Sequence, residues 1–221
     1  MMKIHLITLF FIIISCSENK KNKVEAINKD SIPLVSEKPI ILPDTNNCKL
    51  KIDQTIGFLK MINSGQSFIL KDINDKSTIN VSLNKIKTLN AFLPFAYHND
   101  YNLLVFRCVE RTKEFYKIIV NEKSNKTMLL SDKNKNFKFQ SWSEHILDAC
   151  CIGFEYKSNP IRESKFEKAN IIDEVKDAIF FPIKIEGDWL QVKWGEEKDW
   201  KYGWILWKTG NCVLIEIFYF A

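Results

Sequence analysis

The sequence has little of what most catalytic and metal sites are built from. It contains only 7 glycines and 3 histidines among 221 residues. Neither a glycine-rich phosphate loop nor a Gly-x-Ser-x-Gly motif occurs in it. No Cys-x-x-Cys pair and no two histidines at metal-binding spacing are present, which is unfavourable for a zinc site. These absences predict a protein that is not an enzyme and that needs no cofactor or metal.

Arginine is also scarce. The chain has a formal net charge of +5, and 29 of its 32 basic residues are lysine. Arginine is the residue that makes two-point contacts with phosphate and guanine, because its planar guanidinium matches their geometry. The lysine excess is therefore interpreted as a solvated surface, and no nucleic-acid partner is expected.

Only one long apolar run is present, and it lies at the N-terminus. A short basic start, Met1–Lys3, precedes Ile4–Ile14, which is apolar except at His5 and Thr8. About a dozen residues are too few to span roughly 30 Å of hydrocarbon with ease, whereas a secretory signal has this length. The alternative interpretation is an anchor helix, or a buried helix followed by a chance cysteine.

The segment 13–16, Ile-Ile-Ser-Cys, follows this run and resembles the lipobox of bacterial lipoproteins. In that family the small residue gives the signal peptidase access, and the cysteine thiol receives a diacylglycerol. The resemblance implies removal of residues 1–15 and lipidation of Cys16. Each buried methylene of the lipid adds roughly 0.8 kcal/mol to membrane binding. Ser17 implies sorting to the outer membrane, at its periplasmic face or at the cell surface.

Residues 16–47 have the composition of a linker. They show no strand or helix periodicity, and they are rich in Lys, Asn, Ser and Glu with prolines at positions 33, 39 and 43. Such a segment does not bury enough apolar surface to order itself. We therefore predict a lipidated flexible linker with a span on the order of 30 Å. The alternative is that Ile40–Leu42 docks as an added strand.

Residues 168–221 are predicted to form short strands joined by turns. The strands are expected at Phe180–Glu186, Trp189–Trp194, Tyr202–Trp207 and Cys212–Phe220. Gly187–Lys193, followed by Gly203–Ile205, resembles the signature of bacterial SH3-like domains, in which a Gly-x-Trp-x-x-Val strand precedes a Gly-Trp-Ile or Gly-Trp-Val strand. The resemblance implies a small β-barrel. The family's N-terminal strand with its arginine-bearing loop is not evident here.

Both faces of these strands carry tryptophan, although only one face of each strand is expected to be core. Trp200 and Trp207 have charged neighbours in the sequence, so we expect these two to be exposed. With Tyr202 they are predicted to border a groove for a peptide or a glycan, because amphipathic aromatic residues make good anchors. The alternative is that they pack against a neighbouring module.

Residues 48–158 are predicted to be a β-rich module. Strands are expected at Lys49–Ile52, Ser67–Leu70, Thr78–Leu83, Asn102–Val109, Phe115–Asn121 and Thr127–Ser131, with a short helix at Trp142–Ala149. The spacing of the pair at 115–120 and 128–130 imitates that of the C-terminal pair, which leaves two interpretations, a degenerate second SH3-like unit or a generic hairpin. Ser158–Pro160 and the charged stretch 162–168 mark the boundary between the modules. The predicted class is all-β.

Five of the six cysteines remain after Cys16. They are Cys48, Cys108, Cys150, Cys151 and Cys212. An odd number leaves at least one thiol without an internal partner in an oxidising compartment, and the sequence does not give the pairing. A thiol hydrolase acting on the cell wall, with His98 or His145 as the base, is the enzymatic alternative.

The sequence thus predicts a lipid-anchored envelope protein with an all-β body that binds without catalysis. Its expected partner is a cell-wall peptide, a glycan or another envelope protein. A purely structural envelope protein is the alternative from a third class.

Overall fold

The computed structural model describes residues 48, 50–63, 67–89, 91–173, 175 and 177–220. These residues all belong to one compact unit, Pro39–Ala221. The predicted signal peptide, Cys16 and the predicted linker lie outside the described residues. In the described part, no helix is long and apolar enough to cross a membrane.

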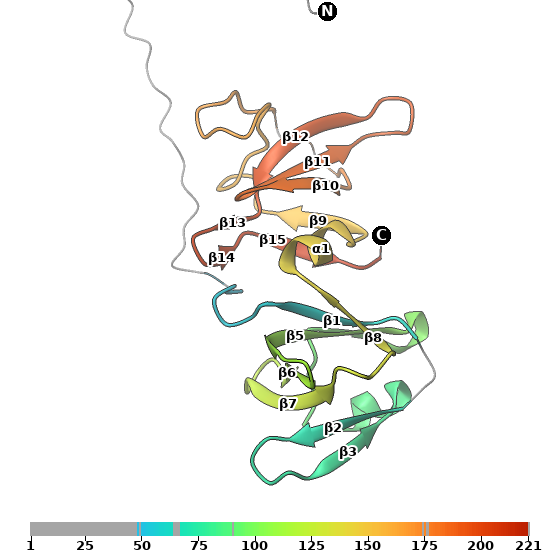
Figure 1. Ribbon diagram of the computed structural model, residues 1–221. Helices are drawn as coiled ribbons and strands as arrows, with labels where there is room; N and C mark the ends of the chain where they lie inside the picture. The colour runs from blue at the N-terminus through green and yellow to red at the C-terminus, as the bar shows by residue number, and fades with distance from the viewer. Residues whose placement is uncertain are drawn as a thin grey trace, which may run out of the picture. The chain divides into compact units, whose positions relative to one another are not determined.

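Eight strands form one antiparallel sheet in the lower half of Figure 1, in the order β3-β2-β7-β6-β5-β1-β8, with β4 added beside β5. The strands are β1 (Gly57–Met61), β2 (Phe68–Asp72), β3 (Thr78–Val81), β4 (Ala96–His98), β5 (Leu103–Arg111), β6 (Phe115–Asn121), β7 (Lys126–Ser131) and β8 (Phe137–Gln140). Two short 3-10 helices, Leu83–Thr88 and Asn99–Tyr101, flank β4 in the sequence.

Strand β1 explains why this sheet has a core on each of its faces. Leu59 and Met61 lie in one cluster of buried side chains, and Phe58, which directly precedes Leu59, lies in another. Successive side chains of a strand point to opposite faces. Because β1 is covered on both faces, nearly all of its residues are buried, and its sequence is a short, mostly apolar run.

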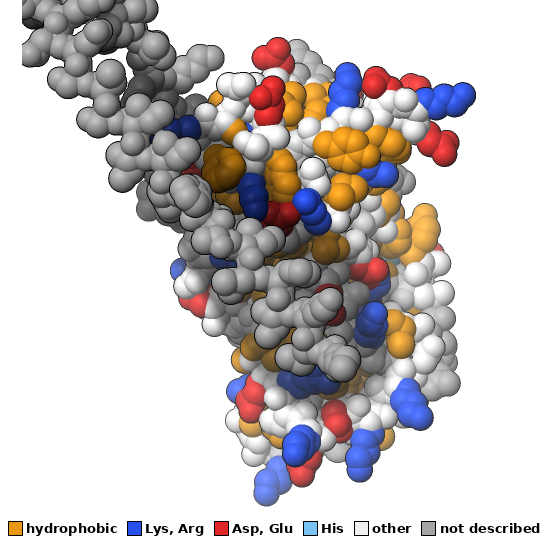
Figure 2. Space-filling view, turned by 45° about the horizontal axis from the view of Figure 1, so that its top comes forward, with side chains coloured by type: hydrophobic (Ala, Val, Ile, Leu, Met, Phe, Trp, Pro, Cys, Tyr) orange, Lys and Arg blue, Asp and Glu red, His pale blue; other side chains and the backbone are white. Residues whose placement is uncertain are grey.

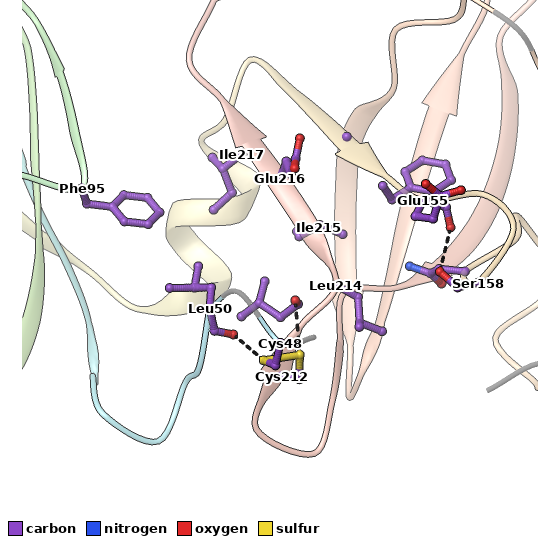
Figure 3. Close-up of a pocket in the computed structure, with 14 residues that line it drawn as sticks. Cys48, Leu50, Phe95, Glu155, Ser158, Cys212, Leu214, Ile215, Glu216 and Ile217 are labelled. Carbon is purple, nitrogen blue, oxygen red and sulfur yellow. Dashed lines mark hydrogen bonds between the residues drawn. A yellow bond between two sulfur atoms is a disulfide. The ribbon is translucent and has the colours of Figure 1, made fainter. Parts of the chain in front are cut away.

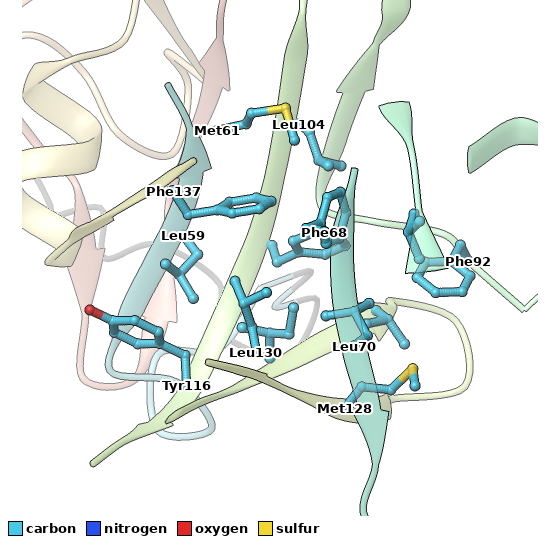
Figure 4. Close-up of a cluster of buried hydrophobic side chains, with 14 of the residues drawn as sticks. Leu59, Met61, Phe68, Leu70, Phe92, Leu104, Tyr116, Met128, Leu130 and Phe137 are labelled. Carbon is cyan, nitrogen blue, oxygen red and sulfur yellow. The ribbon is translucent and has the colours of Figure 1, made fainter. Parts of the chain in front are cut away.

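The first of these clusters, here called the distal core, lies between the strands β1, β2 and β5–β8 of the large sheet. Figure 4 shows Phe68, Leu70 and Leu130 pointing into it from β2 and β7. The rings of Phe68 and Phe137 meet edge to face with their centroids 5.0 Å apart. Burial of each such side chain contributes roughly 1.5–3 kcal/mol.

The remaining elements lie above the large sheet in Figure 1. They form a three-stranded sheet β10-β11-β12 and the two pairs β13-β14 and β15-β9. Their bounds are α1 (Trp142–Leu147), β9 (Cys151–Phe154), β10 (Phe181–Glu186), β11 (Trp189–Trp194), β12 (Lys201–Leu206), β13 (Lys208–Thr209), β14 (Cys212–Val213) and β15 (Ile215–Phe218). Helix α1 begins at Ser141 with a capping box, in which Ser141 and Glu144 each accept a hydrogen bond from the other's backbone N–H.

The second cluster, here called the shared core, joins the two ranges that the sequence divides. It contains Phe58 and Val105 from the large sheet, Ile146 from α1, and Leu190 and Ile205 from the three-stranded sheet. Strand β15 pairs with β9 across the expected boundary at 158–168. The residues expected to form two modules, 48–158 and 168–221, therefore bury apolar surface against each other.

The all-β class is confirmed, since the described residues hold many strands and one short α-helix. Strands β6 and β11 have the predicted bounds. The barrel that the SH3-like resemblance implies is not formed within the described residues, because the sheets there stay open. The strand expected at Cys212–Phe220 is divided into β14 and β15 at Leu214. Strands β6 and β7 pair as a hairpin, which is one of the two interpretations given above for residues 115–130. This hairpin is part of the eight-stranded sheet.

Candidate functional site

Trp207 is not part of an exposed site, so the expectation that it is exposed was wrong. Its side chain is only 4% exposed and belongs to the shared core. The indole Nε1 donates a 2.9 Å hydrogen bond to the backbone oxygen of Gly187. Its ring centroid lies 6.4 Å from that of Trp142 on α1. Helix α1 thus covers the face on which this tryptophan lies, and Trp207 is a packing residue.

Tyr202 and Trp200 lie where a ligand can reach them. Tyr202 stands on β12 directly opposite Lys193 of β11, and its side chain is 51% exposed. Trp200 is half-buried in the loop between β11 and β12. Of the two, Trp200 lines a hollow. The structure therefore keeps two of the three predicted ligand residues at the surface and places one of these two in a groove.

This hollow, here called the Trp200 groove, lies at one end of the three-stranded sheet and has a volume of about 1020 Å³. One wall comes from the described residues between 172 and 181, which lead into β10, and the other from the end of β11 and the loop that follows it. Its aromatic lining is Phe181, Trp194 and Trp200. The end of the molecule that carries this sheet shows apolar side chains gathered at the surface and bordered by charged ones (Figure 2).

The aromatic side chains at the mouth of the groove surround an ammonium of the protein itself. The rings of Phe181 and Trp200 meet edge to face with their centroids 5.7 Å apart. The Nζ atom of Lys193 lies 4.1 Å from the Trp200 ring centroid and 5.9 Å from that of Phe181. An ammonium at such a distance from an indole ring is attracted by the negative face of the ring.

Charge in the groove has the opposite sign to that of the whole chain. Its described lining contains the acidic residues Asp173, Asp177, Glu196 and Asp199 and the lysine Lys201, and Lys193 lies at its mouth. Among the ion pairs of the described residues, none involves these four carboxylates. The groove is thus a locally acidic hollow on a chain with a net charge of +5.

Trp194 lies beneath the groove with an unused hydrogen-bond donor. Its side chain is 3% exposed and lines the groove. The indole Nε1 has no acceptor among the residues that the structure describes. A buried donor without a partner costs roughly 1–3 kcal/mol. Buried donors without a partner are rare in native proteins, so the unused N–H of Trp194 needs an explanation.

The charged segment that the sequence assigns to a boundary pairs with β12, the edge strand of the three-stranded sheet. Arg162 and Trp204 exchange two backbone hydrogen bonds of 2.8 Å each, so the chain at Arg162 lies beside β12. The guanidinium of Arg162 donates to the backbone oxygen of Ala169 at 3.2 Å, and Lys165 pairs with Glu186 of β10. Trp204 is buried, so it offers no surface to a ligand.

A second hollow of about 800 Å³ lies beside the disulfide between Cys48 and Cys212. Figure 3 shows Phe95 reaching toward it from one side, while Leu50 and Ile217 add apolar surface. Glu155 and Glu216 are the charged residues among those that line it. Its polar lining includes Ser158, whose hydroxyl donates to the backbone oxygen of Glu155, and Asn159.

In the part of the chain that the structure describes, neither His98 nor His145 is hydrogen-bonded to a cysteine thiol, the contact that a thiol hydrolase would use. Both ring nitrogens of His145 are engaged, Nδ1 with Gln140 Oε1 at 2.7 Å and Nε2 with the Tyr219 hydroxyl at 2.8 Å. The ring of His98 packs against Tyr101, with the centroids 4.7 Å apart. Burial raises the pKa of the Cys108 thiol to about 12, so this thiol does not ionise readily. Within the described ranges, no three His, Cys, Asp or Glu side chains are grouped so that they could hold a metal.

No protein-family model, no curated protein and no solved structure matches this chain.

Proposed function

We propose that this protein is a lipid-anchored lipoprotein of the bacterial envelope that binds a ligand without catalysis, and that the Trp200 groove is its binding site. The observation that carries the proposal is the position of Trp200, half-buried at the edge of an aromatic and acidic groove. Ligand sites are typically hollows of about 300–1000 Å³ with aromatic walls and a few polar groups. The groove has these properties, and a purely structural protein does not require them.

Two further features support a location outside the cytoplasm. The lipobox-like segment 13–16 supports export and acylation of Cys16. The disulfide between Cys48 and Cys212 fits the same location, because disulfides persist in oxidising compartments and are rare in the cytosol. The expected ligand is a cell-wall peptide, a glycan or another envelope protein.

The test compares the full chain, purified in detergent, with its Trp200→Ala variant. Phe166→Ala is the matched control, because Phe166 is 65% exposed and does not line the groove. Each protein is mixed with purified peptidoglycan sacculi and, separately, with cross-linked envelope extract from the source bacterium. Circular dichroism verifies that the three proteins are folded alike.

The wild type and Phe166→Ala should retain the same ligand, and Trp200→Ala should retain at least about tenfold less, since loss of an aromatic anchor commonly costs more than about 1.4 kcal/mol. Equal retention by all three folded proteins would contradict the proposed site. Trp207→Ala is not a suitable variant for this test, because Trp207 is buried and its loss would reduce stability.

A further inference from the structure

We infer that the Trp200 groove recognises a peptide through a lysine-type primary ammonium, held between the indole of Trp200 and the carboxylates of the groove. This inference rests on the binding role proposed above and names the chemical class of the ligand. Its first support is charge. Four acidic residues line the groove, against Lys201 in its described lining and Lys193 at its mouth, and none of the four is used in an ion pair with a described residue. Clefts of one sign of charge concentrate ligands of the opposite sign.

The aromatic side chains supply the second support. The ammonium of Lys193 already lies 4.1 Å from the centroid of Trp200, so the ring sits in surroundings that accept a cation of this kind. Trp is the aromatic side chain with the strongest cation–π attraction. A ligand ammonium that takes the place of Lys193 beside Trp200 therefore gains from the indole as well as from the carboxylates, whereas an anionic ligand is repelled by the carboxylates.

The size of the groove and the donor beneath it favour a peptide over a small free amine. About 1020 Å³ is at the upper end of the range for a drug-sized ligand, much larger than one amine needs. The unpaired indole N–H of Trp194 is a donor. A peptide offers backbone carbonyl oxygens that pair with such a donor, in addition to its ammonium.

The test uses a short fluorescent peptide in which lysine alternates with glycine, and measures its fluorescence anisotropy with the full chain in detergent. A second peptide carries acetyl groups on every lysine, which removes the charge and keeps the length. Ethanolamine and glucosamine, at equal amine concentration, serve as free amines. The variants are Glu196→Gln and Asp199→Asn in the groove, with Glu114→Gln as the matched control, because Glu114 is exposed in the turn between β5 and β6 and does not line the groove.

We expect the lysine peptide to bind at least about tenfold more tightly than its acetylated form and than either free amine. Glu196→Gln and Asp199→Asn should each weaken binding about threefold or more, and Glu114→Gln should not change it. Raising the salt concentration from about 0.05 M to about 0.5 M should also weaken binding, because salt screens exposed charges. Equal binding of the acetylated peptide, equal binding of a free amine, or no effect of the two groove variants would each overturn the inference.

The two proposals fail in different ways. If Trp200→Ala abolishes retention of the envelope ligand while the lysine peptide shows no preference over its acetylated form, the binding role stands and the cationic ligand class is wrong. If Trp200→Ala changes neither retention of the envelope ligand nor binding of the peptide, the groove is not the binding site.

Discussion

The hydroxyl of Tyr219 donates a 2.8 Å hydrogen bond to Nε2 of His145, a residue that lies 74 positions earlier in the chain. The direction of this bond follows from the neighbours of His145. Gln140 donates its amide N–H to Asp148 at 2.9 Å, so its carbonyl oxygen faces Nδ1 of His145 and accepts the proton there. The remaining nitrogen, Nε2, is then the acceptor. This polar chain fastens the C-terminal end of the protein to helix α1 and to β8.

Stability should fall as the pH falls from about 6.5 to about 4, because of His145. Burial lowers the pKa of His145 from its usual 6.5 to about 4, so the folded protein keeps this ring neutral while the unfolded chain already binds a proton. In this window the unfolded state binds more protons, and the free energy of unfolding therefore decreases as the pH decreases. The loss from this one group is about 3 kcal/mol when the window has been crossed.

Urea denaturation at closely spaced pH values measures this effect. His145→Gln should lower the stability at neutral pH and flatten the profile between pH 6.5 and 4, because the titrating ring is gone. His98→Gln is the control for the loss of one histidine, since the side chain of His98 is exposed. An identical slope for wild type and His145→Gln would show that burial of this ring does not govern the acid response.

Reduction of the disulfide between Cys48 and Cys212 should lower the free energy of unfolding by about 2–5 kcal/mol. The two cysteines are 164 residues apart in the sequence, so the bond removes much of the freedom of the unfolded chain. Urea titrations of the oxidised protein and of the Cys48→Ser/Cys212→Ser variant give the difference. Cys150→Ser, which removes a half-buried free thiol, should change the midpoint little. Equal midpoints for the double variant and the wild type would mean that this bond does not form.

Gly203→Ala should be destabilising because Gly203 is a close-packing position. A Cβ atom there would lie 2.2 Å from Cγ2 of Ile161 and 3.3 Å from the backbone oxygen of Arg162. Ile161 is fully buried, so it has little room to move, and such overpacking costs about 1–3 kcal/mol. Chemical denaturation gives the value.

Gly210→Asn is the matched control for Gly203→Ala. No atom lies within 4 Å of a Cβ at Gly210, and its φ of 54° is one that asparagine tolerates. This variant should stay within about 0.5 kcal/mol of the wild type, as surface substitutions usually do. A Gly203→Ala variant as stable as Gly210→Asn would contradict the packing of the segment at 161–162 against β12.

The sequence predicted correctly those strands whose own residues and flanking turns are typical of a β-strand. Strand β6 combines aromatic and β-branched residues, and β11 lies between a Gly-Asp turn and a polar loop, so both were predicted with their observed bounds. Strand β1 was missed, because Gly57–Met61 has no β-branched residue and becomes a strand by pairing with β5 and β8. Those partners lie more than 40 residues away in the sequence, and pairing of this kind has no local signature.

The candidate site was predictable in part for the same reason. The position of Trp200 between Asp199 and Lys201 in a polar loop indicated a surface residue, and it lines a groove. Trp207 has an equally polar successor in Lys208, yet it is buried, because α1 covers its face. Alternation along a strand shows which side chains share a face, but it does not show which face a distant element covers. Two of the four acidic residues of the groove, Asp173 and Asp177, lie more than 20 residues before Trp200, and no motif in the sequence indicated that they line it.

Wild-type protein grown with labelled palmitate should carry the label on Cys16. The apolar run Ile4–Ile14 and the segment 13–16 predict cleavage before Cys16 and acylation of its thiol. Cys16→Ala should remove the label and leave residues 1–15 attached, because the lipid and the cut depend on the same thiol. Cys150→Ala is the control, since its thiol is free and far outside the lipobox-like segment, and it should be labelled like the wild type. Mass spectrometry of the mature N-terminus detects both the cleavage before Cys16 and its acylation. Equal labelling of Cys16→Ala and wild type, or a wild-type protein that still carries residues 1–15, would contradict the lipid anchor. The ligand of the groove would then not be expected at a membrane.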